Sequence, residues 1–191
     1  MNKLNKIFFM ILFFASCVNE RNTEIQLEKT LKNSNENCVY SANLKATNVI
    51  WSGYKTTDKI KVTGKFNKFN SKKILEKNEF SNLNDLIEDL DFSIDLSSSS
   101  SGDEIRDLNL KNYFFNLFAS NFVLNGKFEK IENDSIDVVL DFFGNQKKIR
   151  LGYAYENNMI QIKGSINLLE NLGALKAFES ISNKCYDLHK G

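Results

Sequence analysis

The sequence predicts a mainly β protein whose strands follow one another as an antiparallel meander. Apolar and polar residues alternate in at least seven segments, and this period of two is typical of strands with one buried and one exposed face. Short polar turns such as Glu132-Asn133-Asp134 and Glu156-Asn157-Asn158 separate the later segments. Two segments alone carry apolar residues at helical spacing. The predicted strands cover residues 49–54, 59–66, 91–96, 121–128, 136–142, 149–153 and 160–166.

The strand over residues 59–66 shows the pattern most clearly, because lysine or threonine alternates there with apolar residues and a glycine. Consecutive antiparallel strands of this kind bury their apolar faces as a sandwich of two sheets or as a barrel closed on itself. About eight strands leave an interior that side chains can fill or that can hold one small ligand. Glycines on the apolar faces leave two interpretations open, an interior cavity or the sharp bends of a barrel. They are Gly53, Gly64, Gly126 and Gly164.

Two segments interrupt the strand pattern. Residues 81–90 begin with a serine suited to cap a helix, and four apolar residues follow it at helical spacing. Residues 168–188 carry apolar residues three or four apart, which predicts one amphipathic helix or a broken pair of helices. The run from Ser97 to Gly102 is too polar to pack and is predicted to be a mobile loop.

The N-terminal segment has the pattern of an export signal. Lys3 and Lys6 precede an uninterrupted apolar run over residues 7–14, far shorter than the roughly 20 residues that a membrane-spanning helix needs. Ala15-Ser16-Cys17 follows, and this arrangement resembles the lipobox of bacterial lipoproteins, in which the chain is cut before the cysteine and the cysteine is acylated. An ordinary signal peptide with an incidental cysteine is the alternative.

The lipoprotein interpretation divides the chain into three parts. We expect a signal peptide over residues 1–16, a flexible polar tether over 17–37 that starts at the acylated Cys17, and one domain over 38–191. The domain would then be exported and held on a membrane by its acyl anchor, facing the periplasm or the cell surface.

Cysteine content and charge limit the partners. After acylation of Cys17, Cys38 and Cys185 remain, an even pair that forms either a disulfide in an oxidising compartment or two buried thiols. The formal net charge of +1 argues against nucleic acid, which needs a concentrated basic face. Because no zinc-type Cys/His spacing and no catalytic or nucleotide-binding fingerprint occurs, the sequence predicts no enzyme, no metal and no cofactor.

Four blocks, in this order, resemble the YceI-like family over roughly residues 40–190. The first is Val49-Ile50-Trp51-Ser52-Gly53-Tyr54-Lys55, and the second, Val62-Thr63-Gly64-Lys65-Phe66, is similar to that family's V-x-G-x-F strand. The third joins Phe92-Ser93-Ile94-Asp95, the serine run, Arg106-Asp107 and Phe114-Phe115. The fourth is Gly164-Ser165-Ile166-Asn167-Leu168, followed by Cys185.

This resemblance implies a lipocalin-like antiparallel β-barrel of about eight strands, with one or two short helices, that binds a long isoprenoid or similar lipid and catalyses nothing. The chain departs from the family where it ends near His189, because similar relatives continue into a final strand. Because of this departure, the sequence does not decide between a closed and an incomplete barrel.

The candidate ligand-binding residues are aromatic side chains expected in the barrel interior, with core packing as the alternative for the pair at 114 and 115. They are Trp51, Phe66, Phe92, Phe114, Phe115, Phe122, Phe128 and Phe142. Arg106 and Asp107 follow the serine run, where they are expected to clamp it onto the barrel or, alternatively, to recognise a lipid head group.

The sequence therefore predicts a membrane-anchored protein that holds or carries an apolar lipid of the isoprenoid class. The alternative is an interaction or structural lipoprotein, on the cell surface or in the periplasm, whose barrel is solidly packed. A homodimer is left open.

Overall fold

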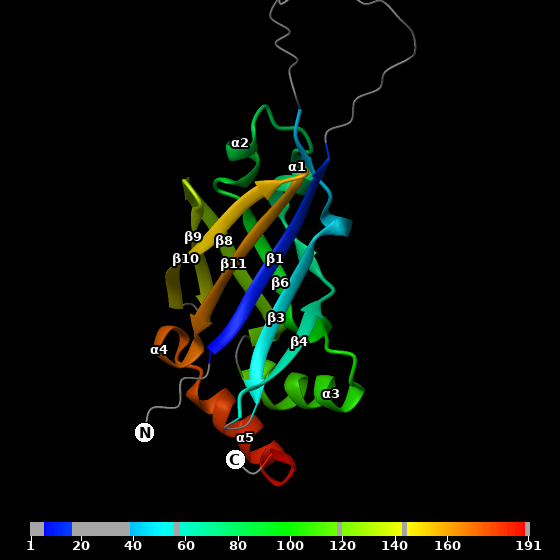
Figure 1. The fold of residues 1–191 in the computed structure, drawn as a ribbon, viewed down its shortest axis with the longest axis vertical. Helices are drawn as coiled ribbons and strands as arrows, with labels where there is room; N and C mark the ends of the chain where they lie inside the picture. The colour runs from blue at the N-terminus through cyan, green and yellow to red at the C-terminus, as the bar shows by residue number, and fades with distance from the viewer. Residues whose placement is uncertain (1–5, 17–38, 56–57, 118–119, 143–144, 190–191) are drawn as a thin grey trace, which may run out of the picture.

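The computed structural model describes residues 6–16, 39–55, 58–117, 120–142 and 145–189 (Figure 1). Among these residues, no helix is long and apolar enough to cross a membrane. The strands are β1 (Lys6–Ser16), β2 (Ser41–Ala42), β3 (Asn48–Lys55), β4 (Ile60–Phe66), β5 (Phe69–Asn70), β6 (Asp91–Asp95), β7 (Ser99–Ser100), β8 (Val123–Glu132), β9 (Ser135–Phe142), β10 (Asn145–Glu156) and β11 (Met159–Asn167). The helices are α1 (Lys72–Glu76), α2 (Leu83–Ile87), α3 (Glu104–Tyr113), α4 (Leu168–Leu172) and α5 (Leu175–His189). Single 3-10 turns are η1 (Leu44–Ala46), η2 (Leu96–Ser98), η3 (Phe115–Leu117) and η4 (Ser120–Phe122).

The strands form one antiparallel sheet in the order β5-β6-β8-β9-β10-β11-β1-β3-β4-β7, and β2 pairs with the end of β1. The two ends of this order meet, because β5 continues β4 after a two-residue bend and β7 continues β6 after η2. Backbone hydrogen bonds join these segments: the Asn67 N–H donates to the Ser98 carbonyl at 3.2 Å, and the Asp95 N–H donates to the Lys68 carbonyl at 3.1 Å. The pairing therefore runs right round a barrel, with β4–β5 and β6–β7 each acting as one bent strand.

Each of the seven predicted segments contains a strand, which confirms the antiparallel barrel, although Asn121 and Phe122 of the segment 121–128 lie in η4. The alternation also places the inner face correctly: Phe92, Phe128, Ile136 and Ile162 are buried in one continuous core. Helices cover the two ends, with α1 and α2 at the upper end in Figure 1 and α3, α4 and α5 at the lower end. Inside the lower end, Phe178 of α5 packs edge-on against Phe114, with ring centroids 5.2 Å apart.

In the uncleaved chain, the apolar N-terminal segment is a strand of the barrel wall. Strand β1 pairs antiparallel with β11 from Lys6↔Asn167 to Phe14↔Met159, and with β3 from Phe8↔Ser52 to Leu12↔Asn48. The alternation of polar and apolar residues could not indicate this strand, because residues 7–14 are uniformly apolar. The barrel of the uncleaved chain thus includes residues on both sides of the predicted tether.

The glycines on the inner face make room for the protein's own side chains. A Cβ on Gly126 would overlap the ring of Phe92 on the neighbouring strand β6, and a Cβ on Gly64 would overlap the ring of Trp51 on β3. A Cβ on Gly164 would likewise overlap Leu151. At these three positions the space above the glycine is therefore filled by the protein's own side chains, and it is not part of an empty cavity.

The helical segments differ in detail from the prediction. The segment 81–90 holds only the short helix α2, and Asn82 caps it in place of Ser81 by accepting a hydrogen bond from the Asp85 N–H at 2.8 Å. The segment 168–188 is a broken pair, α4 and α5, because Gly173 ends α4 in the left-handed conformation with φ 61°. Helices α1 and α3 were not predicted, since neither carries a clear apolar stripe in its sequence.

The prediction of a mobile loop over the serine run is wrong. Ser99 accepts a hydrogen bond from the Trp51 indole N–H at 3.1 Å, and the Ser98 hydroxyl oxygen accepts from the N–H groups of Asn67 and Lys68 at 3.1 Å each. Serine hydroxyls can replace the partners that a sheet would supply, and here they fasten η2 to the bend between β4 and β5 and β7 to β3.

We expect Gly126→Ala to lower the free energy of unfolding by about 1–3 kcal/mol, because the new methyl group overlaps Phe92 in a packed core. Gly152→Ala is the matched control: Gly152 is exposed on β10 and its Cβ would only touch the Lys163 carbonyl at 3.4 Å. Urea unfolding of both variants measures the difference. A Gly126→Ala variant as stable as Gly152→Ala would show that the ring of Phe92 does not lie over the glycine.

Candidate functional site

The barrel interior holds two connected groups of aromatic rings. In the first, Phe92 lies between Phe69 and Phe128, with ring centroids 5.8 and 4.8 Å away. In the second, Phe115 of η3 contacts Phe66 at 5.5 Å and Phe114 at 5.4 Å. These distances are within the 4.5–7 Å at which aromatic pairs attract each other.

The candidate ligand-binding residues do not all have the same position. Six of the eight are buried in the core: Trp51, Phe66, Phe92, Phe114, Phe115 and Phe128.

Trp51 differs from the other five buried residues because its indole N–H donates a hydrogen bond to Ser99. Phe122 is not part of a strand as predicted: it belongs to η4 with φ 60°, is only half-buried, and has the Lys111 ammonium 5.9 Å from its ring. The side chain of Phe142 lies outside what the structure describes.

The inner face is not buried everywhere. Val62 on β4 and Ile149, Tyr153 and Tyr155 on β10 face inward yet remain only half-buried, in contrast to Leu151 between them. Inward side chains that keep exposed surface are the positions at which a ligand could contact the interior without displacing the packed core. The half-buried inward side chains of β10 are therefore candidate ligand contacts.

Tyr153 carries the one buried side-chain polar atom for which the described structure provides no hydrogen-bond partner. Burial raises the pKa of its phenol to about 12, with the neighbouring Tyr155 adding to the effect, so the hydroxyl is protonated at neutral pH. The neighbouring Tyr155 hydroxyl, in contrast, donates to Asn158 Oδ1 at 3.1 Å. The alternation in the sequence predicts Tyr153 on the inner face of a strand. Nothing in the sequence indicates that its hydroxyl has no partner among the described residues.

A short backbone bridge lies beside α1 and α2 at the upper end of the barrel (Figure 1). The N–H and carbonyl of Tyr40 exchange hydrogen bonds of 2.8 and 2.9 Å with Phe80, between α1 and α2. The rings of Tyr40 and Tyr155 also pack edge-on, with centroids 6.5 Å apart. The bridge therefore lies beside the end of β10 that carries Tyr155.

Arg106 and Asp107 both contact the end of the serine run. Asp107 accepts from the Ser101 N–H at 2.9 Å and from the Ser101 hydroxyl at 2.6 Å, while Arg106 donates to the same hydroxyl at 3.2 Å. Arg106 also pairs with Asp103 at 3.1 Å, where Asp103 caps α3. In the described structure the hydrogen bonds of both side chains therefore hold Ser101 against the start of α3.

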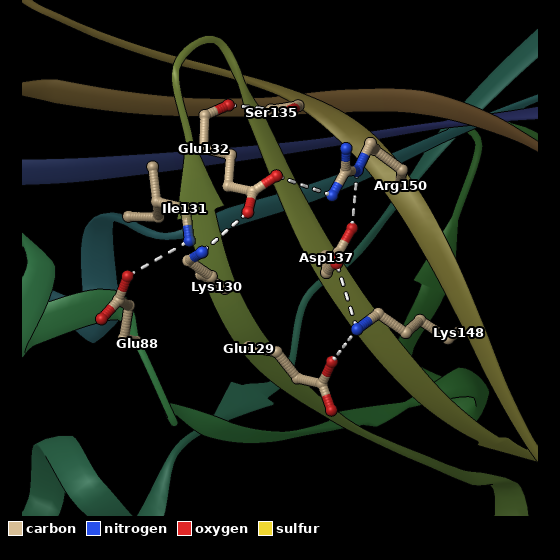
Figure 2. Close-up of polar contacts among 9 residues, drawn as sticks. All are labelled: Glu88, Glu129, Lys130, Ile131, Glu132, Ser135, Asp137, Lys148 and Arg150. Atoms are coloured by element: carbon tan, nitrogen blue, oxygen red, sulfur yellow. Dashed lines mark hydrogen bonds and ion pairs between the residues drawn. The ribbon is translucent and has the colours of Figure 1, made fainter.

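A network of charged side chains covers the outer face of β8, β9 and β10 (Figure 2). Asp137 is its centre, with Arg150 Nε at 2.7 Å and Lys148 Nζ at 3.1 Å, and its side chain is only 12% exposed. Hydrogen bonds from Arg150 and Lys148 lower the pKa of Asp137 from 3.8 to about 2. Glu132 and Glu129 extend the network to β8 through Arg150 and Lys148. This cluster lies outside the barrel and ties three strands together.

The cysteine predictions fall mainly on residues outside the described ranges. Cys17 and Cys38 both lie there, so neither the anchor nor the disulfide with Cys185 is tested. Cys185 is half-buried on α5, at the lower end of the barrel.

Within the described parts of the chain, no three His, Cys, Asp or Glu side chains lie together as metal ligands would. The described interior is apolar apart from a few hydroxyl groups, and charged side chains are on its outside.

Comparisons with known proteins support the fold. No family model matches the chain, and no curated protein matches it. Among solved structures, it is similar to a polyisoprenoid-binding domain from Saccharophagus degradans that is implicated in plant cell wall breakdown. The TM-score is 0.51 at 15% sequence identity, and the match covers 75% of this chain and 86% of that one. At this identity the likeness shows the fold alone, and it confirms the lipocalin-like antiparallel barrel.

We expect Asp137→Asn to lower the melting temperature at pH 7, because Arg150 and Lys148 would lose the carboxylate that they share. A folded-state pKa below the unfolded value means that the stabilisation is present above about pH 4 and is lost as the pH falls through about 2. The melting temperatures of wild type and variant should therefore converge between pH 4 and pH 2. Glu156→Gln, an exposed carboxylate on β10, is the control. A gap that stays constant down to pH 2 would contradict the role of the ionised carboxylate.

Proposed function

We propose that this domain binds a long apolar molecule of the isoprenoid class, or a similar lipid, inside its barrel and holds or carries it without catalysing a reaction. The observation that supports this most is the shared fold with a domain that binds polyisoprenoids. The aromatic interior and the half-buried row along β10 agree with an apolar ligand, since burial contributes about 25 cal/mol for each Å² of apolar surface removed from water. Membership of the YceI-like family is part of the same proposal.

The alternative, an interaction or structural protein with a solid barrel, is favoured by a different observation. The side chains of Trp51, Phe92 and Leu151 fill the space over three inward glycines. If the β10 row is filled in the same way, the interior has no room for a lipid. The two functions therefore differ in whether a ligand can reach the inner face of β10.

A titration with a long-chain isoprenoid alcohol tests the proposal. Trp51 is the only tryptophan and lies in the barrel, so we expect a saturable change in its fluorescence on binding. Ile149→Phe adds bulk at a half-buried inward position and should weaken binding by about tenfold, equivalent to about 1.4 kcal/mol. Lys163→Phe makes a comparable change on the exposed face of β11 and should leave the affinity unchanged. A wild-type protein that gives no saturable signal, or equal effects of the two variants, would favour the solid barrel.

We further propose that the protein is exported and anchored by acylation of Cys17, on the strength of the sequence Ala15-Ser16-Cys17 after a short apolar run. Two or more acyl chains give stable anchoring, whereas one gives only marginal binding. Cleavage before Cys17 would remove β1 from its place between β11 and β3. The backbone groups of those two strands would then need new partners, because unpaired edges are costly when buried and prone to pair with other chains. The barrel of the processed chain would therefore differ from that of the uncleaved chain between β11 and β3.

Cys17→Ser should move the protein from the membrane fraction to the soluble fraction, or leave it as an unprocessed chain, because the acylated thiol is lost. Fractionation and intact mass measure both results. The control is Cys185→Ser, which leaves the proposed anchor intact. A Cys17→Ser protein that is processed and membrane-bound like wild type would refute the anchor. A wild-type mass that retains residues 1–16 would show instead that β1 stays in the mature barrel.

A further inference from the structure

The hydroxyl of Tyr153 is the least explained polar group in the described interior. A phenol hydroxyl that is removed from water normally has a hydrogen-bond partner, since leaving it without one costs the desolvation of the group. Tyr153 is held in place by β10: its N–H donates to the Asp134 carbonyl at 2.7 Å, and it lies opposite the fully buried Ile162 on β11. The strand therefore fixes an unpartnered hydroxyl beside apolar side chains.

The surroundings limit what this hydroxyl can bind. The neighbouring inward residues Leu151, Ile160 and Ile162 are buried and apolar. Among the side chains that the structure describes, the buried polar or charged ones are Ser52, Ser71 and Asp137, so no buried lysine or arginine is available to neutralise an anion. A phosphate would have to leave water without a counter-charge, which is strongly unfavourable. An uncharged oxygen meets no such penalty.

We propose that the Tyr153 hydroxyl is the polar anchor of the ligand site, donating a hydrogen bond to an uncharged hydroxyl or carbonyl oxygen at one end of a long apolar ligand. This inference rests on the proposed function and adds the chemistry of the ligand's polar end. The phenol is protonated at neutral pH and so serves as a donor. The half-buried Ile149 and Tyr155 on the same inner row would contact the apolar chain next to it.

The test compares three probes with the same unsaturated C20 isoprenoid chain: the alcohol geranylgeraniol, the hydrocarbon that lacks only its hydroxyl group, and geranylgeranyl diphosphate. Affinities are read from Trp51 fluorescence in the full chain. We expect wild type to bind the alcohol about five- to tenfold more tightly than the hydrocarbon, as one hydrogen bond allows. Tyr153→Phe should abolish this preference by weakening only the alcohol. Tyr54→Phe, the same change on the exposed outer face of β3, should preserve it.

The outcomes separate this inference from the proposed function. If Tyr153→Phe keeps the preference for the alcohol, or if the diphosphate binds most tightly, the polar anchor is refuted while lipid binding stands. If no probe binds to wild type, the proposed function fails and the anchor fails with it. Thermal unfolding is the second readout: because the described residues offer the hydroxyl no hydrogen-bond partner, Tyr153→Phe should melt no lower than wild type. A clear drop in melting temperature would show that the hydroxyl stabilises the fold and would overturn its assignment to a ligand.

Discussion

The closure of the sheet on itself is the constraint on which the rest of this structure depends. An open sheet would leave two rows of backbone groups unpaired, whereas here the bent strand β4–β5 pairs with the bent strand β6–β7 and joins the two ends. The bend is held by serine hydroxyls and by the indole of Trp51. Closure gives the barrel one inner face, so the inward side chains of its strands meet in the same core.

Packing inside the barrel and charge outside it have separate roles. Inside, glycines opposite Trp51 and Phe92 allow large rings to lie flat against the wall, which fills the interior without forcing the strands apart. Outside, Asp137 gathers Arg150 and Lys148 and fastens β9 to β10. Strand β10 contributes to both faces of the wall. Its outward Lys148 and Arg150 pair with Asp137, while its inward Ile149, Tyr153 and Tyr155 are half-buried.

The sequence predicts most strands of the barrel but few of the contacts at the candidate site. The strict alternation around Val62 and Gly64 identifies a strand because only a strand presents every second residue to a core. Strand β1 could not be recognised, since a uniformly apolar run looks the same in a signal peptide and in a barrel wall. The unpartnered hydroxyl of Tyr153 and the cluster around Asp137 depend on which residues become neighbours across strands. Such pairings follow from the register between neighbouring strands, which depends on the turns that join them as well as on the hydrophobic pattern of each strand.

Native mass spectrometry of the protein purified from the membranes of its own host tests the central claim most directly. The account predicts a fraction with added mass that corresponds to a long apolar molecule with an uncharged oxygen, released on unfolding. Because acylation would also add mass, the covalent anchor is identified first on the denatured chain. A native mass equal to the denatured mass in every preparation would contradict the account, and the barrel would then be a solidly packed support for interactions on its outer surface.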